Sequence, residues 1–257
     1  MHRSAKLLAR GNYDVDFSGD GFVETHELAD TLNYAASELS KTDRLQKELI
    51  ANISHDLRTP LTMITGYSEV MRDIPGENTP ENVQVIIDET ERLSLLVNDL
   101  LELSRLQAAS SAFEMEKVDP LETLYELHDR TQGLAKEKGL EMKIYPPKEN
   151  VIVCTNEDRL QQVLTILLDN AIKYTPAGGS ITLGAENTPQ GMRFFVRDTG
   201  IGMSEHDTLH VFERFYQADP SHGAKGSGLG LSIAKEILQK MDVKIRVVSA
   251  PGKGSEF

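Results

Sequence analysis

The chain has 257 residues, a formal net charge of -13 at pH 7 and a single cysteine. This length allows two compact domains plus linkers. The acidic balance excludes a nucleic-acid-binding surface, because phosphate binding would need a clustered basic face. One cysteine excludes an intramolecular disulfide and argues against a thiolate metal site. Cys154 ends the apolar run of residues 151–154, so we predict it to be a core residue.

Residues 7–13 have the pattern of a helix end followed by a glycine, and residues 24–33 have the pattern of a second helix. Together they resemble the latter part of a HAMP linker. In that family the linker follows a transmembrane segment, which implies a parent protein in the cell membrane. The chain itself has no apolar run of bilayer length and no signal-peptide pattern, so we expect a soluble, cytoplasmic fragment in which residues 1–40 are a partial HAMP linker and signalling helix.

Residues 16–27 also fit a competing motif, the twelve-residue EF-hand loop that binds calcium. The matching ligand and turn positions are Asp16, Ser18, Asp20, Gly21, Val23 and Glu27. Gly11 would weaken an entering helix, and no second loop is present for pairing. We therefore favour the HAMP interpretation and keep calcium binding as the alternative.

Residues 53–61 place a titratable nucleophile on an amphipathic helix. His55 can offer an unprotonated ring nitrogen to an electrophile, and Asp56 can orient the ring or take its proton. Pro60 removes a backbone donor and is predicted to bend the helix, which opens the face on which a bulky donor must dock. By itself a His-Asp pair on a helix is usually an ordinary surface pair, so the pattern needs support from the rest of the chain.

Two long helices are predicted around this motif. Apolar residues recur at threes and fours over residues 35–72 and 83–106, and residues 73–80 break the pattern. Two such helices cannot bury their apolar faces alone. A hairpin that pairs with its copy makes a four-helix bundle, so we predict that residues 41–110 form a homodimerisation unit with His55 on its outside. The alternative is packing of the hairpin onto the following domain.

After a linker at residues 108–112, short strands are predicted to alternate with helices. The expected strands cover residues 113–118, 141–145, 151–154, 180–186, 192–197 and 244–249, and the expected helices cover 120–138, 157–173 and 229–241. This pattern indicates an α/β sandwich with helices on one face of the sheet. The predicted fold class is therefore α+β and multi-domain.

A nucleotide pocket is predicted from four segments of this region. In the first, a helix leaves Asn170, Lys173 and Tyr174 on one edge, where an amide oxygen can ligate magnesium and an ammonium can meet phosphate. In the second, a buried strand runs into Asp198, which can accept a hydrogen bond from a base amine. The glycines that follow, Gly200 and Gly202, let the backbone approach a flat ring.

The other two segments supply a cation, aromatics and free amides. Residues 211–216 contain Arg214 and Phe215. A glycine-rich turn then opens a helix whose dipole suits phosphate, with candidate contacts at Gly226, Gly228, Leu229 and Gly230. Residues 204–225 are polar and loose, and we predict a lid over the nucleotide. Singly, each segment is more often an ordinary turn or a solvated helix edge.

Together, in this order and at these intervals, the segments resemble the N, G1, F and G2 boxes of the catalytic domain of sensor histidine kinases. The His55 run resembles the H box of the same family, so the resemblance covers the chain from about Lys41 to its end. It implies the Bergerat ATP-binding fold for residues 111–257. A Rossmann alternative fails, because Gly226 follows a polar loop and not a strand.

The resemblance implies an ATP-dependent protein-histidine kinase in a two-component phosphorelay. It assigns magnesium to Asn170, phosphates to Lys173, Arg214 and the amides of residues 226–230, and adenine to Asp198 with Tyr174, Gly200 and Gly202 around it. His55 then attacks the γ-phosphoryl group, and the phosphate passes to an aspartate of a response-regulator receiver. The pattern of Asp56 and Thr59 after His55 is the one by which bifunctional members position water, so we hypothesise phosphatase activity as well.

Two rival functions stay open: a hydrolytic ATPase or chaperone of the same nucleotide fold, and a catalytically inactive interaction scaffold. One position departs from the family. One turn before Asn170 the family commonly has a polar residue, and the hydrolytic relatives have a carboxylate there, whereas this chain has Ile166. An alkyl group cannot accept a proton, so we expect slow hydrolysis by water relative to transfer to His55.

Overall fold

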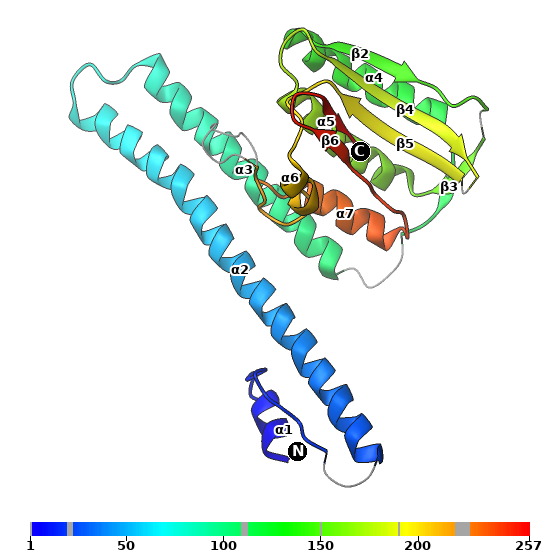
Figure 1. Cartoon of the computed structure of the whole chain (residues 1–257). Coiled ribbons are helices and arrows are strands. Elements are labelled where there is room, and N and C mark those ends of the chain that lie inside the picture. Colours follow the sequence, from blue (N-terminus) through cyan, green and yellow to red (C-terminus); the bar gives the residue numbers. More distant parts are fainter. Residues whose placement is uncertain (1, 20–22, 109–112, 150, 190, 219–226) are drawn as a thin grey trace. The chain divides into compact units, whose positions relative to one another are not determined.

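The computed structural model describes the chain except for residues 1, 20–22, 109–112, 150, 190 and 219–226 (Figure 1). The helices are α1 (His2–Leu8), α2 (Val23–Asp73), α3 (Pro80–Ala108), α4 (Pro120–Glu137), α5 (Glu157–Tyr174), α6 (Glu205–His210) and α7 (Gly230–Lys240). The strands are β1 (Glu116–Val118), β2 (Glu141–Tyr145), β3 (Val153–Thr155), β4 (Ser180–Thr188), β5 (Gly191–Asp198), β6 (Val248–Ala250) and β7 (Gly254–Glu256). Two long helices thus precede a mixed α/β region, which confirms the predicted fold class.

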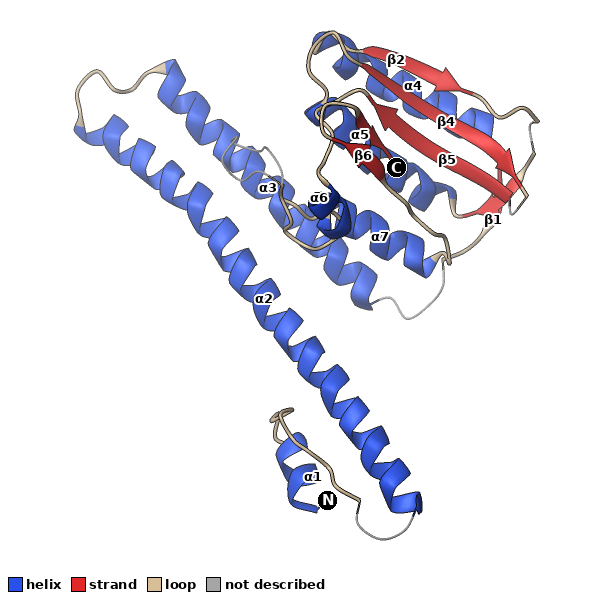
Figure 2. Cartoon of the chain, in the orientation of Figure 1, coloured by secondary structure: helices blue, strands red, loops and turns tan. Residues whose placement is uncertain are grey.

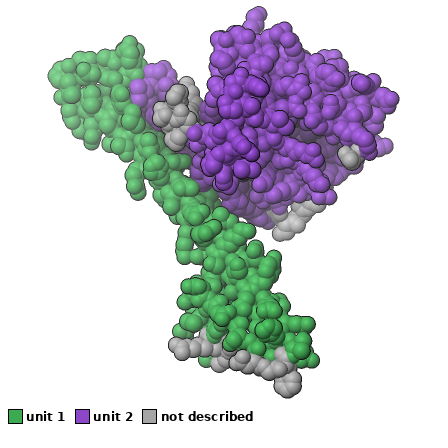
Figure 3. All heavy atoms as spheres, in the orientation of Figure 1, with its two compact units in different colours: residues 1–83 green, residues 84–257 purple. Residues whose placement is uncertain are grey.

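The chain divides into two compact units, Met1–Val83 and Gln84–Phe257, which Figure 3 colours separately. Unit 1 contains α1, an extended connector and α2. Unit 2 contains most of α3 and all later elements. None of the helices that the structure describes combines the length and the apolar character needed to span a membrane.

A small core in unit 1 holds the connector against the start of α2. Phe17, Ala29 and Ala36 are buried, and Leu8, Val15 and Leu32 pack against them. The side-chain amide of Asn33 accepts from the Phe17 N–H at 2.8 Å and donates to the Phe17 C=O at 3.0 Å. One side chain therefore satisfies both backbone groups of a connector residue that has no strand partner.

The EF-hand alternative falls partly outside the described residues, since Asp20 and Gly21 are among those not described. In the remainder, the Asp16 C=O accepts from the Ser4 hydroxyl at 2.9 Å. In the parts of the chain that the structure describes, no group of three or more His, Cys, Asp or Glu side chains is placed to hold a metal ion.

The two predicted long helices are present, with longer bounds than expected. α2 is continuous from Val23 to Asp73, so the predicted second linker helix and the helix of residues 35–72 are one element, and it runs on through Pro60. α3 begins with Pro80 in its first turn, where a missing N–H costs nothing. Thr79 precedes it and accepts from the Asn82 N–H through its hydroxyl at 3.2 Å, which explains why the helix starts there.

Unit 2 is built on a mixed five-stranded sheet in the order β2-β4-β5-β7-β6. The β2–β4 pair is parallel and the other pairs are antiparallel, while β1 and β3 form a separate antiparallel pair. α4 and α5 pack against one face of the sheet, and α7 packs on α5 (Figure 2). The core between these layers is fully buried at Leu164, Leu168, Ile181, Leu183 and Ile237.

Local capping explains where the two sheet-covering helices start. Asp119 accepts from the Leu121 N–H and precedes Pro120, and Asn156 accepts from the Arg159 N–H. Both caps satisfy a backbone donor that the helix cannot satisfy itself, which stabilises each helix by about 1 kcal/mol. α5, which carries the N box, is thereby fixed at its beginning by its own sequence.

Two expectations were wrong in detail. Cys154 is exposed, because β3 alternates and turns Val153 and Thr155, but not Cys154, toward the interior. The strand expected at residues 244–249 starts only at Val248, and a further strand, β7, follows it. The predicted lid, residues 204–225, lies outside the described residues from 219 onward and stays a prediction; its described part opens with a short helix, α6, which Ser204 and Asp207 fix through a reciprocal capping box.

Candidate functional site

The candidate phosphoacceptor His55 lies on α2 with its side chain 78% exposed. Its Nδ1 is 3.0 Å from Asp56 Oδ1. A carboxylate can only accept, so Nδ1 carries the proton in this contact and the lone pair resides on Nε2. Asp56 thus fixes the tautomer of the ring, and Nε2 is the nitrogen left for attack on an electrophile.

Thr59 and Pro60 follow on the same helix. The Thr59 hydroxyl donates to the His55 C=O at 3.4 Å, and Thr59 is exposed. Pro60 is buried and has no N–H, so the Asp56 C=O lacks its usual helical partner. The phosphoacceptor segment therefore combines an exposed imidazole, a carboxylate and a hydroxyl within two turns of one helix.

The C-terminal end of α5 carries Asn170, Lys173 and Tyr174. Asn170 is half-buried, and its side chain makes no hydrogen bond to any residue that the structure describes. Its amide oxygen is therefore available as a ligand, which fits a magnesium ion held mainly by nucleotide phosphates and water. Lys173 Nζ lies 4.7 Å from the Tyr174 ring centroid, and Lys138 Nζ caps the helix by donating to the C=O of residues 172 and 173 at 2.6 and 2.7 Å.

Asp198 ends β5 and is only 7% exposed. Its Oδ1 accepts from the Gly200 N–H at 2.7 Å and from the Ser255 N–H at 3.2 Å. Burial raises the pKa of this carboxyl, and the two amide hydrogen bonds oppose that shift. No described residue donates to Oδ2, so this oxygen is free to accept from a ligand amine.

The glycines around Asp198 are required by close approach of other backbone. A Cβ on Gly200 would lie 2.5 Å from the Tyr174 C=O oxygen, and one on Gly202 would lie 1.9 Å from the Ala250 C=O oxygen. A Cβ on Gly254 would lie 2.0 Å from the Asp198 C=O oxygen. The α5 end, the loop after β5 and the β6–β7 turn are thus packed together without side chains between them.

Sequence reasoning missed the contribution of Gly254 and Ser255 to this site. Both lie in β7, which pairs with β5 beside Asp198. The available signal was the spacing Gly252-x-Gly254-Ser255, a second glycine pair close to the end of the chain. Such a short glycine pair is more often an ordinary turn, so by itself it does not indicate a site.

Arg214 and Phe215 follow α6 in the chain. Arg214 Nη2 lies 3.6 Å from Glu236 Oε2 of α7. Phe215 has a φ of +62°, an uncommon left-handed conformation for an aromatic residue, and its N–H donates to the Gly228 C=O at 3.0 Å. Gly228 also has a positive φ, and a Cβ there would lie within 2.8 to 3.1 Å of the Phe215 backbone. The predicted F and G2 segments are therefore joined backbone to backbone.

The glycine-rich turn leads directly into α7. Gly226 lies outside the described residues. Leu229 is completely buried and precedes Gly230, the first residue of α7, and no side chain caps this helix. Ile166 lies beneath it, since its Cγ2 is 3.3 Å from where a Cβ on Gly230 would be. The departure from the family pattern thus places an alkyl group under the start of α7, the helix predicted to bind phosphate.

The described candidates of unit 2 fall into a base-binding end and a phosphate-binding end. The first contains Asp198 with its glycines and Tyr174; the second contains Arg214, Phe215, Gly228, Leu229 and Gly230. Asn170 lies on α5, which contacts both β5 and α7. A buried acceptor, an unbonded amide and an uncapped helix start are the groups that a purine nucleotide with magnesium needs.

Two family models match the chain. The His Kinase A (phospho-acceptor) domain matches residues 45–109, and the histidine kinase-, DNA gyrase B-, and HSP90-like ATPase matches residues 155–257. Together these matches cover more than half of the chain. The phosphoacceptor helix pair and the nucleotide-binding region are therefore matched independently.

Known proteins agree with both matches. Sensor histidine kinase WalK of Bacillus subtilis (strain 168) is 36% identical over 229 residues, which are 86% of this chain and 37% of WalK. The structure of full-length ShkA in complex with AMPPNP is similar, with a TM-score of 0.60, 32% identity, and coverage of 82% of this chain and 44% of ShkA. Histidine kinase ThkA, solved in complex with response regulator protein TrrA, has the same fold at 23% identity, with a TM-score of 0.70 and coverage of 85% of this chain and 62% of ThkA.

The chain spans little more than a third of the length of its curated relative WalK. Within that span, His55 lies in the region matched by the phosphoacceptor domain, and Asp198 with its glycines lies in the region matched by the ATPase. The chain therefore belongs to the sensor histidine kinases of two-component systems.

Proposed function

We propose that this chain autophosphorylates His55 with ATP and transfers the phosphoryl group to an aspartate of a response-regulator receiver. The observation that carries the proposal is the state of Asp198: a buried carboxylate with one oxygen bonded by two backbone amides and the other free. A base with an exocyclic amine satisfies the free oxygen, whereas a base with a carbonyl there would be repelled. Adenine is thus selected over guanine.

The catalytic step needs one nucleophile and charge compensation. His55 Nε2 attacks the γ-phosphorus, a P–N bond forms, and the bond from the γ-phosphorus to the bridging oxygen breaks to release ADP. The proton stays on Nδ1, where Asp56 accepts a hydrogen bond from it, and the carboxylate stabilises the positive charge that develops on the ring. In phosphoryl transfer, most of the rate acceleration comes from alignment and electrostatic stabilisation.

The residues of unit 2 have separate tasks in this proposal. Asn170 would hold magnesium, whose charge compensates the phosphates, and Lys173, Arg214 and the amides of the turn up to Gly230 would bind the phosphates themselves. Tyr174, Gly200 and Gly202 would enclose the base, with Phe215, Gly228 and Leu229 forming the opposite wall. Ile166 offers no general base, so water would compete poorly with His55.

The direct test is transfer of label from γ-labelled ATP. His55→Ala should abolish acid-labile labelling while nucleotide affinity stays near that of the wild type, because His55 lies in unit 1 and Asp198 in unit 2. His26→Ala, which removes another exposed histidine of α2, is the matched control and should label normally. Acid-labile labelling that persists in His55→Ala would exclude His55 as the phosphoacceptor.

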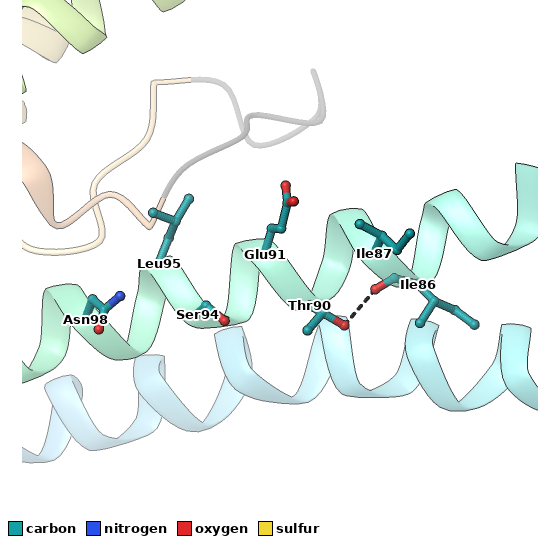
Figure 4. A pocket seen from close by; sticks show the side chains of 7 residues that line it. All are labelled: Ile86, Ile87, Thr90, Glu91, Ser94, Leu95 and Asn98. Atoms are coloured by element: carbon teal, nitrogen blue, oxygen red, sulfur yellow. Dashed lines mark hydrogen bonds between the residues drawn. The ribbon is translucent and has the colours of Figure 1, made fainter.

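We also propose that residues 41–110 form a homodimer and residues 111–257 the catalytic domain. α3 supports this with an open apolar groove, shown in Figure 4, lined by Ile86, Ile87, Thr90, Glu91, Ser94, Leu95 and Asn98. Leu95, which lines this groove, is 64% exposed, and Ile87 is 43% exposed, so the groove leaves large apolar side chains in contact with solvent. A second copy of the chain would cover this face as part of a four-helix bundle.

Phosphatase activity toward the regulator is a further part of the proposal. Thr59 is exposed one helix turn after His55, where its hydroxyl can position water. Thr59→Ala should lose dephosphorylation of a receiver that accepts the group but keep autophosphorylation. Thr62→Ala is the control, since Thr62 makes the same kind of hydroxyl contact to the preceding turn.

The N-terminal segment would connect this output to a membrane receptor. The two hydrogen bonds between the Asn33 side chain and the Phe17 backbone, together with the small core around Phe17, support a HAMP-type connector in residues 1–40. A parent protein in the cell membrane, with this chain on its cytoplasmic side, follows from that interpretation.

A further inference from the structure

The phosphate-binding end of unit 2 is held by α3. The Ser227 hydroxyl donates to Asp99 Oδ2 of α3 at 2.5 Å. The same hydroxyl oxygen accepts from the Leu229 N–H at 3.1 Å. A carboxylate of α3 is therefore connected through one serine to the residue that precedes α7.

Asp99 lies where a helix start favours an anion. α7 begins at Gly230 without a side-chain cap, so its first turn has free amides and the positive end of the helix dipole. Asp99 and Gly230 line the same open pocket of about 620 Å³. A carboxylate at this position does what a nucleotide phosphate would do there: it places negative charge beside an uncapped helix start.

Arg214, the cation of the phosphate-binding end, also has partners in the structure. The side-chain amide of Gln107, near the end of α3, accepts from Arg214 Nη1 and Nη2 at 3.1 and 2.8 Å in the orientation that satisfies both groups. Glu236 Oε2 of α7 lies 3.6 Å from Nη2 of the same guanidinium. α3 thus contacts both the glycine-rich turn and the arginine that the proposed function assigns to phosphates.

A third contact anchors α3 to α5. Glu102 pairs with Arg159 of α5, and Gln162 donates to the same carboxylate at 3.3 Å. The open pocket lies among these polar contacts. Polar contacts around an open pocket are exchangeable with water and ligand groups, unlike a closed apolar interface.

We propose that Asp99 is an internal anion that competes with nucleotide phosphates for the start of α7, so that docked α3 holds the kinase in a state of weak ATP binding. The inference rests on the proposed function and adds the regulation of its phosphate site. ATP entry then requires α3 to withdraw Asp99 from Ser227. A movement of α3, whose sequence continues from the phosphoacceptor helix, would change ATP affinity without any change at Asp198.

The experiment is calorimetric titration of the whole chain with ATP, ADP and adenosine. Asp99→Asn removes the charge and keeps an acceptor for Ser227, while Asp99→Ala removes both. We expect ATP to bind Asp99→Ala about tenfold more tightly than the wild type, because like-charge repulsion at short range is relieved. Asp99→Asn keeps its contact with Ser227, so its ATP affinity should lie between those of the wild type and Asp99→Ala. The gain should be smaller for ADP and absent for adenosine, which has no phosphates.

Asp88→Asn is the matched control, because Asp88 lies on α3 and its carboxylate, among the described residues, accepts only from Gln84 of the same helix. It should leave all three affinities unchanged. Unchanged ATP affinity in both Asp99 variants, with normal adenosine binding, would overturn the competition while leaving the proposed kinase function intact. An equal gain for adenosine would also overturn it, since the effect would then not depend on phosphate. Failure of ATP and adenosine to bind any variant would overturn the proposed function and the inference together.

Discussion

The base-binding and phosphate-binding ends of unit 2 are built in different ways. At the base-binding end, Asp198 ends a sheet strand, and both amides that bind it come from the sheet or the loop directly after it. At the phosphate-binding end, Phe215 and Gly228 have positive φ angles, and Ser227 and Arg214 take partners from α3. One end is fixed by the fold, and the other by contacts that can be exchanged.

Under the proposed function, this difference places specificity at one end and control at the other. Recognition of the base would depend on a preorganised acceptor whose position the sheet determines, so a movement of α3 would leave it unchanged. Binding of the phosphates would depend on groups that a neighbouring helix can occupy. A sensor that must keep its substrate preference while its activity changes needs this separation.

The largest expected effect tests how rigidly the base-binding end is built. Gly202→Ala should reduce the free energy of unfolding by about 3 kcal/mol or more, because the new Cβ would lie 1.9 Å from a backbone oxygen of Ala250 and φ is +66°. Chemical denaturation measures the loss. Gly252→Ala is the control: its φ is also positive, at +72°, but nothing lies within 4 Å, so only about 1 kcal/mol should be lost. Equal losses at both positions would show that backbone approach is not what fixes this loop.

The next effect concerns the free oxygen of Asp198. Asp198→Asn should weaken ATP binding by about 10- to 100-fold, the range for loss of a hydrogen bond to a charged group. Wild-type protein should prefer ATP over GTP, and the variant should lose most of that preference. A variant that keeps the preference would show that other groups recognise the base.

The sequence predicted the parts of this site that are local. Asp198, Gly200 and Gly202 lie within five residues, and the turn they form follows from the residues themselves. Ser255 reaches the same carboxylate from 57 positions further along the chain, and only the pairing of β5 with β7 brings it there. Long-range pairing of such a short strand leaves little trace in local patterns.

Errors elsewhere have similarly specific causes. Cys154 was predicted as a core residue from a continuous apolar run, but a three-residue strand in a two-stranded sheet buries alternate positions only. The helix α6 had a signal, Ser204 followed three residues later by Asp207, within a segment whose overall polarity indicated a loop. The contact of Asp99 with Ser227 spans 128 positions and had no sequence signal at all.

The pH dependence of ATP binding should distinguish the two ends further. Burial raises the pKa of Asp198, so this carboxyl gains a proton at a higher pH than an exposed one. ATP affinity should fall as the pH is lowered through that raised pKa, because a protonated carboxyl no longer accepts well from a base amine. The stability of the free protein changes in the opposite sense. A carboxyl whose pKa is raised in the folded state contributes stability below its unfolded-state pKa, and this contribution is lost as the pH rises through the folded-state pKa.

Titrations between pH 4.5 and pH 7.5, roughly the range from an ordinary carboxyl pKa to neutrality, measure both trends. Asp198→Asn should remove the fall in ATP affinity at low pH that comes from protonation of Asp198. Burial also raises the pKa of Asp99, so Asp99→Asn is the variant that removes the contribution of the phosphate-binding end. A profile that Asp198→Asn leaves unchanged would contradict the role of its ionised form.

The smallest expected effect concerns the strained backbone at the phosphate-binding end. Phe215 has a φ of +62° beside Gly228. Phe215→Gly and Phe215→Ala lose the same ring contacts, but only glycine adopts this conformation without strain, so the glycine variant should be more stable by about 1 kcal/mol. At Val211, where φ is -57°, the order should reverse, because glycine there adds only unfolded-state entropy. Thermal or chemical unfolding of the four variants measures both differences. If glycine were the less stable choice at both positions, the left-handed Phe215 would store no strain, and the join between the F and G2 segments would be as relaxed as the loop around Asp198.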